Sequence, residues 1–238
     1  MSRVLIAVGG TGQEIALACL RLCHMAGIEP PLIVIVDSDQ GTGRRDPPTR
    51  TDELQRFKVF FKQTWGQEFV DFVTPFAQNV PGRPLKTLRG LFSPAGETPP
   101  LIQDLLFLLF SPSQQGTGIS DGFHGKPTVG SVAVADYMEE TEFKQQFLDR
   151  LSTLTEPKSP HFIVLAGSTT GGTGPGTIPP LSEKLMAWRK GLNPPRNIQI
   201  SGVVQLEWFQ GCATNLWVRI DLPFFLLYCL NAVQAVRQ

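Results

Sequence analysis

The chain has 238 residues, of which 42% are hydrophobic and 18% are charged, and its formal net charge at pH 7 is zero. A chain of this length and composition is globular rather than disordered and can bury one sizeable core. The zero net charge excludes the basic footprint of a nucleic-acid-binding protein, and no apolar run reaches the roughly 18 residues that a membrane-spanning helix needs. The chain runs straight into a strand-like segment without a signal-peptide pattern, so we expect a cytoplasmic protein.

The cysteines and histidines show no metal-ligand spacing. The four cysteines are Cys19, Cys23, Cys212 and Cys229, and the three histidines are His24, His124 and His161. Buried, reduced thiols are the expectation that fits a cytoplasmic protein. Cys19 and Cys23 share one helix face, so a metal site completed by His24 stays open as an alternative.

The first glycine-rich loop follows an apolar run, Arg3–Val8, that predicts a strand. The loop is Gly9-Gly-Thr-Gly12, and apolar periodicity then predicts a helix to about Ala26, stopped by Gly27. A strand, a glycine turn and a helix in this order form a phosphate-binding arrangement. The dinucleotide fingerprint is incomplete, because Ile15 stands where its last glycine or alanine belongs.

A second strand is predicted over Pro31–Val36, and the polar segment Asp37-Ser-Asp-Gln40 follows it. Ligands bind at the carboxyl ends of strands in open α/β sheets, so this segment is a candidate binding loop. The alternative is a polar turn that only ends the strand. Residues 51–64 then predict a helix with an inward face, made by Phe57, Val59, Phe60 and Phe61.

The middle of the chain, about 98–160, is predicted to be a long insert. Its apolar segment Leu101–Phe110 predicts a core helix, and 111–127 has the composition of a loop. Thr128–Val134 has the short β-branched pattern of a strand, and 136–154 alternates charged and apolar residues as a surface helix does.

The richest signal is His161–Trp188. A buried strand is predicted over Phe162–Ala166, and a helix is predicted from about Pro179. Between them, 167–177 contains glycines and hydroxyl residues in a proportion that a simple turn does not need. Glycine lets backbone N–H groups approach a ligand, and the helix N-terminus adds positive potential, so a second phosphate-binding loop is predicted. A flexible linker is the alternative.

Residues 197–208 predict a further strand, and Asp221 is a candidate N-cap for a helix over 223–236. The 238 residues are interpreted as one nucleotide-binding domain.

The segment Gly171-Gly-Thr-Gly-Pro-Gly176 resembles the GGGTG[ST]G signature of the tubulin/FtsZ superfamily, with Thr170 and Pro175 as departures. Three further segments resemble that family in the same order. The polar residue Gln13 ends the first loop, Asp39 and Gln40 match its N-T-D-A-Q loop, and 85–91 is similar to its L-T-R-G-L segment. Asn231 lies in a context similar to the family's base-reading asparagine. The long insert is similar to divergent bacterial tubulin-like proteins.

The resemblance implies a doubly wound, mostly parallel α/β fold of Rossmann-like type that binds GTP or GDP, with Mg²⁺ accompanying the triphosphate. The residues it places at the nucleotide, with the two glycine loops, are Gly9, Gly10, Thr11, Gly12, Gln13, Asp37, Asp39, Gln40, Arg89, Gly90, Gly171, Gly172, Thr173, Gly174, Gly176 and Asn231. Lys86 is a further candidate phosphate partner. The alternative function is a Rossmann-like sensor that binds a nucleotide second messenger or NAD and signals to a partner protein.

Catalysis is a separate question. In the family, hydrolysis needs acidic residues on a loop after the central helix. This loop enters the nucleotide site of the neighbouring subunit in a filament. The chain ends at Gln238, in or just past that helix, so we expect weak GTP hydrolysis unless a partner or another segment completes the site. No catalytic residue is assigned. The same resemblance allows self-association or a protein partner. A branched side chain at Gly172 is expected to abolish nucleotide binding while the fold is retained.

Overall fold

The computed structural model describes residues 2–37, 49–73, 87–92, 100–119, 123, 125–139, 143–154, 159–206 and 216–221. Asp39, Gln40, Lys86 and Asn231 lie outside these residues, as does the helix expected over 223–236. The strands are β1 (Arg3–Val8), β2 (Leu32–Val36), β3 (Val70–Val73), β4 (His161–Ser168), β5 (Ile198–Leu206) and β6 (Leu216–Asp221). The helices are α1 (Gly9–Ala26), α2 (Arg50–Trp65), α3 (Leu88–Leu91), α4 (Pro100–Leu109), α5 (Pro112–Gln115), α6 (Pro127–Tyr137), the π-helix η1 (Lys144–Leu148), α8 (Asp149–Leu154) and α9 (Thr173–Gly191).

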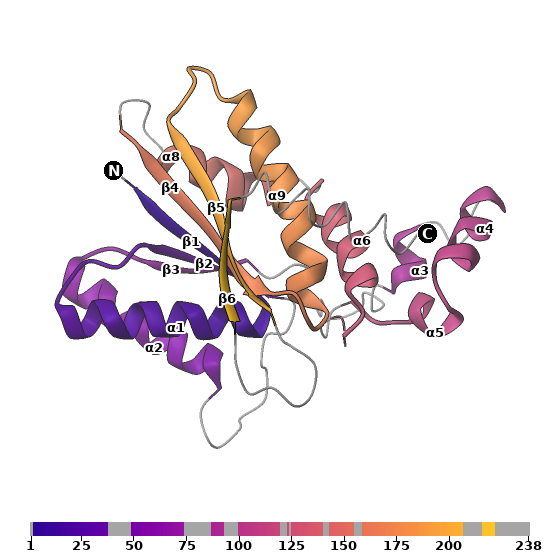
Figure 1. Ribbon diagram of the computed structural model, residues 1–238, viewed down its shortest axis with the longest axis horizontal. Coiled ribbons are helices and arrows are strands. Elements are labelled where there is room, and N and C mark those ends of the chain that lie inside the picture. The colour runs from indigo at the N-terminus through magenta and orange to yellow at the C-terminus, as the bar shows by residue number, and fades with distance from the viewer. Residues whose placement is uncertain are drawn as a thin grey trace.

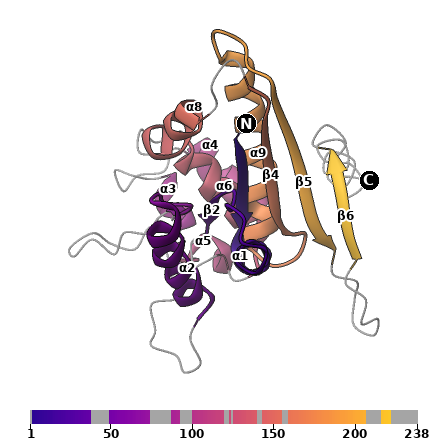
Figure 2. The ribbon, with the colours of Figure 1, turned by 90° about the vertical axis from the view of Figure 1, so that its left-hand side faces the viewer.

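The strands form one sheet in the order β3-β2-β1-β4-β5-β6. The first five are parallel, and β6 pairs antiparallel with β5 at the outer edge, beside which it stands in Figure 2. The chain moves outward from β1 to β3, and then returns to the other side of β1 to lay down β4. The predicted doubly wound, mostly parallel α/β fold is therefore confirmed, and its topological switch point lies between β1 and β4.

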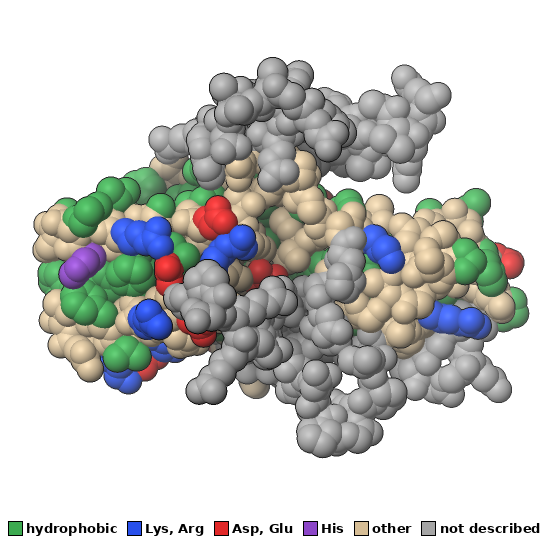
Figure 3. Space-filling view, turned by 90° about the horizontal axis from the view of Figure 1, so that it is seen from below, with side chains coloured by type: hydrophobic (Ala, Val, Ile, Leu, Met, Phe, Trp, Pro, Cys, Tyr) green, Lys and Arg blue, Asp and Glu red, His purple; other side chains and the backbone are tan. Residues whose placement is uncertain are grey.

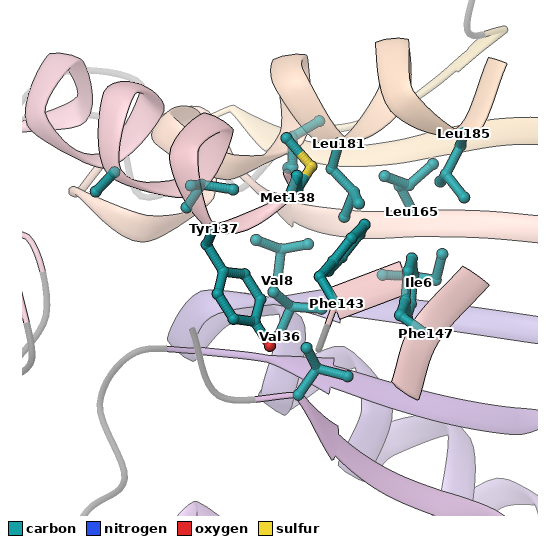
Figure 4. Close-up of a cluster of buried hydrophobic side chains, with 14 of the residues drawn as sticks. Ile6, Val8, Val36, Tyr137, Met138, Phe143, Phe147, Leu165, Leu181 and Leu185 are labelled. Carbon is teal, nitrogen blue, oxygen red and sulfur yellow. The ribbon is translucent and has the colours of Figure 1, made fainter. Parts of the chain in front are cut away.

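The alternation of side chains along each strand divides the core into two layers. In β1, Val4, Ile6 and Val8 face the layer under α6 and α9, whereas Leu5 and Ala7 face the layer under α1 and α2. Figure 1 shows α1 and α2 on one side of the sheet and α9 on the other. Figure 4 shows Ile6, Val8 and Leu165 of the sheet among side chains from α6, the π-helix region and α9. Helices on both faces explain why the strands are continuous apolar runs.

Helix ends follow their local signals. The first helix ends where expected, because Gly27 adopts a left-handed conformation with φ of 62° and its N–H bonds back to the helix. The second helix begins after Thr49, whose hydroxyl accepts from the backbone N–H of Asp52, while the Asp52 carboxylate accepts from the N–H of Thr49. This capping box places Arg50 at the first helical position.

The strand predicted over Thr128–Val134 is wrong, because these residues lie in α6. Pro127 occupies the first turn, where its missing N–H costs nothing. The buried residues Val129, Ala133, Val134 and Tyr137 are spaced as one face of a helix rather than of a strand. A short apolar run does not distinguish the two, and here packing against α9 decides for the helix.

The surface helix predicted over 136–154 is also corrected. The described part is broken into the end of α6, the π-helix η1 and α8, and three of its side chains, Phe143, Phe147 and Leu151, are buried in the core. The helical prediction for α4 is confirmed, and its placement in the core is correct only in part, because Leu106 and the adjoining Phe110 are buried there. Within α4 only Leu106 is buried, and Leu108 is 79% exposed. Figure 1 shows α3, α4 and α5 grouped beyond α6, away from the sheet.

The inward face predicted for α2 is correct in part. Phe61 is buried, whereas Val59 and Phe60 are exposed. No helix in the described ranges is long and apolar enough to cross a membrane.

Candidate functional site

Two long helices begin side by side at the switch point. The chain leaves β1 directly into α1 at Gly9, and it leaves β4 through a short turn into α9 at Thr173. A Cβ at Gly9 would lie 3.2 Å from the Thr173 Cβ and 3.3 Å from the backbone nitrogen of Gly174. Because β1 and β4 are parallel neighbours, both helix N-termini point to the same edge of the sheet, where each contributes a partial positive charge.

Neither of these N-termini is satisfied by a side chain. Among the described residues, no side chain caps α1 or α9, and neither first turn contains an acidic residue. The contrast with α2 is direct, since that helix has a capping box and both Asp52 and Glu53 in its first turn. The first N–H groups of a helix have no partner within the helix, so α1 and α9 together present a set of N–H donors suited to an anion.

The two N-termini border a cleft of about 460 Å³. Seven of the predicted site residues line it, namely Gly9, Gly10, Thr11, Gly171, Gly172, Thr173 and Gly174. The other lining residues are Val8, Glu14, Arg50, Ser168, Thr170 and Gln205. The two glycine-rich loops, about 160 residues apart in the chain, are thus brought to one site.

The hydroxyl residues after β4 stabilise their own turn. The Thr170 N–H donates to the Ser168 hydroxyl at 3.0 Å, and the two hydroxyl oxygens lie 2.9 Å apart. The Thr169 N–H donates to the carbonyl of Gln205 at 3.0 Å, which ties the turn to the end of β5. These hydroxyls hold the shape of the turn, so the donors that face the cleft are mainly those of the backbone.

Several of the predicted glycines are required by packing. A Cβ at Gly12 would lie 2.6 Å from the carbonyl carbon of Ala7, and one at Gly174 would lie 2.6 Å from the carbonyl oxygen of Ser168. These two glycines let α1 and α9 approach the ends of β1 and β4. A Cβ at Gly176 would lie 2.9 Å from the Gly130 Cα, so this glycine allows α6 and α9 to cross closely.

Gly172 has a packing role as well, since its Cβ would lie 2.8 Å from the Phe123 Cβ and 3.0 Å from the backbone nitrogen of Gly125. A valine at position 172 would therefore press on the side chain of Phe123 and on the backbone of Gly125, so we expect Gly172→Val to disturb this packing as well as nucleotide binding. By contrast, a Cβ at Gly171 would meet nothing within 4 Å, although its φ of 87° favours glycine. A Cβ at Gly10 would meet only the guanidinium of Arg50. Gly10 and Gly171 are the glycines whose open side faces the cleft.

The helix that follows the second loop begins earlier than predicted. It starts at Thr173 instead of about Pro179, and it continues through Pro179 and Pro180. Buried contacts of Ile178, Leu181 and Leu185 hold this helix on the sheet despite the lost backbone bonds. Pro175 falls at the third helical position, where an N–H has no helical partner, so it removes an anion donor without weakening the helix.

The remaining predicted residues lie away from the lining of the cleft. The buried Gln13 amide donates from Nε2 to Oδ2 of the buried Asp37 at 2.8 Å, which joins α1 to the end of β2. Arg89 and Gly90 lie in α3, where the N–H of Gly90 donates to the Thr87 hydroxyl. Gln13 and Asp37 thus lie beside the first glycine loop, but neither they nor Arg89 and Gly90 are among the described lining residues of the cleft, and their role toward a nucleotide stays a prediction.

The charged residues of the cleft were missed by sequence reasoning. Of the described lining residues, Glu14 and Arg50 carry charge, and Arg50 Nε lies 2.9 Å from Glu14 Oε1. Glu14 directly follows the first loop, which is a usable signal, whereas Arg50 lies at the start of α2, well after the end of β2 in the sequence, and offers none. On the face that carries α1 and α2, seen from below in Figure 3, the acidic and basic side chains of the described residues are interleaved.

The described cysteines lie outside the cleft. Cys23 is buried and Cys19 half-buried, and burial, followed by the neighbouring Cys23, raises the pKa of Cys19 to about 11. Both described thiols are free, and no group of His, Cys, Asp and Glu that could hold a metal occurs in the part of the chain that the structure describes. Cys19, Cys23 and His24 therefore do not form the alternative metal site.

No protein-family model matches the sequence, and no curated protein matches it. A solved structure of CetZ2 from Haloferax volcanii, a GTPγS-bound protofilament, matches with a TM-score of 0.40 and 17% sequence identity. The match covers 85% of this chain and 39% of that chain, so the chain spans less than half of that protein's length. The fold assignment rests on the strand order and the two helical layers described above.

Proposed function

We propose that this domain binds a guanine nucleotide, GTP or GDP, with its phosphates between the N-termini of α1 and α9. The observation that carries the proposal is the convergence of two uncapped helix N-termini, without first-turn acids among the described residues, at the switch point of a doubly wound sheet. This is the position at which such sheets bind nucleotides, and N–H groups with a helix dipole suit phosphate.

The guanine base is proposed from the resemblance of Gly171–Gly176 to the tubulin/FtsZ signature. Mg²⁺ would enter with the triphosphate, since it keeps phosphate oxygens and waters as ligands and needs few from the protein.

The binding test is calorimetry with GTP, GDP, ATP and NAD at matched concentrations in the presence of Mg²⁺. We expect measurable binding of GTP and GDP and weaker binding of the other two. Tighter binding of NAD or ATP would replace the guanine assignment by the sensor alternative. No binding of any of the four would remove the proposal.

A matched pair of variants tests the phosphate position. Thr11 lies at the third helical position of α1 and lines the cleft. In Thr11→Asp, the new carboxylate interacts favourably with the dipole at the N-terminus of α1, so we expect the fold to be retained. The same carboxylate places a negative charge where phosphate is proposed to bind. We expect GTP binding to be lost in Thr11→Asp and largely kept in Thr11→Asn, which has the same shape without the charge. Equal affinities of the two variants for GTP would contradict the placement.

A further inference from the structure

Arg50 reaches from α2 across the N-terminus of α1. Its Nη1 lies 2.6 Å from the position that a Cβ of Gly10 would occupy, and its Nε lies 2.9 Å from Oε1 of Glu14. The capping box of Thr49 and Asp52 fixes the backbone from which this side chain starts. The guanidinium therefore lies directly over one of the two glycines that open toward the cleft.

The negative charge of a bound nucleotide exceeds the partial positive charge of the two helix N-termini, so a side-chain cation is needed to balance it. Even with the Mg²⁺ that accompanies it, a nucleoside triphosphate carries about two negative charges, whereas the two helix N-termini supply only about +0.5 each. Arg50 is the one cationic side chain among the described residues that line the cleft. A side-chain cation beside the backbone N–H groups adds a charge-assisted contact whose effect on affinity grows with the negative charge of the bound phosphates.

The ion pair with Glu14 orients Arg50 without using up its donors. The contact is made through Nε, and a guanidinium has further N–H groups on its two Nη atoms that suit bidentate contact with phosphate. The side chains of Arg50 and Glu14 are 53% and 62% exposed, so the pair itself is worth little to stability. A purely structural bridge at this place would therefore contribute little to the fold.

We propose that Arg50 is a phosphate-binding residue of this cleft, positioned by Glu14, and that it makes the site prefer nucleoside di- and triphosphates to monophosphates. This inference rests on the proposed nucleotide site and deepens it. Arg50 contacts the phosphates beyond the one that lies nearest the ribose, and its effect on affinity therefore grows with the number of phosphates.

The chain offers a matched control. Arg21 and Glu53 form a second ion pair between the same two helices, away from the lining of the cleft. The Arg21 side chain is 55% exposed, which is close to the value for Arg50. Arg21→Gln therefore removes the same charge and the same kind of bridge from the same helix pair without touching the proposed phosphate site.

The experiment measures the calorimetric affinities of GTPγS, GDP and GMP for the wild-type chain, Arg50→Gln, Arg50→Lys and Arg21→Gln at one salt concentration with Mg²⁺. A hydrogen-bonded charge contact accounts for about tenfold or more in affinity, so Arg50→Gln should weaken the binding of GTPγS by at least that factor. The affinity of Arg50→Gln for GMP should differ from that of the wild type by less than about twofold. Arg50→Lys keeps the charge but loses the planar fork, and its GTPγS affinity should be intermediate. Arg21→Gln should match the wild type throughout, and urea midpoints should show that all variants fold.

Three results would overturn the inference. GTPγS binding by Arg50→Gln within twofold of the wild type would show that Arg50 does not contact phosphate. Equal losses for GMP and GTPγS would show that it acts on the nucleoside or on the shape of the site. A wild-type chain that binds none of the three nucleotides removes the proposed function and this inference together, whereas wild-type binding that Arg50→Gln leaves unchanged removes the inference alone.

Discussion

Gly12 and Gly10 lie two residues apart in the first turn of α1, but an added methyl group meets different surroundings at each position. At Gly12 it would lie 2.6 Å from the carbonyl carbon of Ala7 and 2.8 Å from the carbonyl oxygen of Ala166. Both are backbone atoms of central strands, so neither can turn aside. At Gly10 it would meet only the end of the Arg50 side chain, which can move.

The Gly12→Ala variant must therefore lift α1 from β1 and β4 or strain the strands. Overpacking of this kind costs about 1–3 kcal/mol, and the gain in helix propensity from glycine to alanine offsets at most about 1 kcal/mol of it. We expect a net loss of about 1–2 kcal/mol in the free energy of unfolding. For a chain of this size that corresponds to a fall of roughly 2–8 °C in Tm. In Gly10→Ala only the flexible end of the Arg50 side chain must shift, so the stability of this variant should stay close to that of the wild type.

The assay is urea unfolding followed by circular dichroism, with calorimetric GTP affinity measured on the same preparations. Gly12→Ala should shift the urea midpoint downward with an unchanged m-value. Gly10→Ala should leave the midpoint in place but lower the affinity for GTP. Gly191→Ala is the control, because it lies at the far end of α9 and its Cβ meets nothing within 4 Å. A wild-type midpoint for Gly12→Ala would refute the close approach of α1 to the two strands.

Three further outcomes are expected. Thr49→Ala should lower the free energy of unfolding by about 1 kcal/mol because it removes the hydroxyl that caps α2, and Thr49→Ser should restore it; the urea midpoints of the two variants decide. The N–H and hydroxyl of Thr49 also lower the pKa of Asp52 below 3.8. The stability that this ionised carboxylate adds to the folded state is therefore present above pH 3.8 and is lost as the pH falls through the lowered pKa. If Asp52→Asn unfolds in acid over the same pH range as the wild type, this expectation is contradicted. Because the pKa of Cys19 is raised from 9.0 to about 11, native Cys19 should react with iodoacetamide at pH 8 roughly 100-fold more slowly than in urea, as read by peptide mass spectrometry. The raised pKa adds stability below pH 9.0 that is lost as pH rises toward 11, and fast native labelling would show the thiol to be exposed.

Much of the framework could be predicted because it depends on neighbours in the chain. The continuous apolar character of 3–8 and 162–166 predicts buried strands, and each is followed by glycines that allow a sharp entry into a helix. Gly27 predicts the end of α1 because only glycine adopts its backbone conformation without strain. The doubly wound arrangement of these elements was predicted from the resemblance to the tubulin/FtsZ signature, and the strand order of the sheet agrees with it.

The errors occurred where local patterns are ambiguous. The residues of α6 fit a strand or a helix by composition, and contact with Gly176 of α9 requires the helix. The apolar side chains of α4 predicted burial, but its place beyond α6 leaves most of them exposed. Hydrophobicity shows what a segment gains from burial, and not whether another element is near enough to cover it.

The sequence by itself determined that two glycine-rich turns follow two buried strands, because backbone freedom and side-chain periodicity are local properties. The tertiary structure decided that the two turns face one cleft, since only the parallel pairing of β1 with β4 brings Gly9 next to Thr173. It also decided which glycines serve packing and which open toward the cleft, and it brought Arg50 over Gly10. Those outcomes depend on contacts between segments far apart in the chain, which no local pattern encodes.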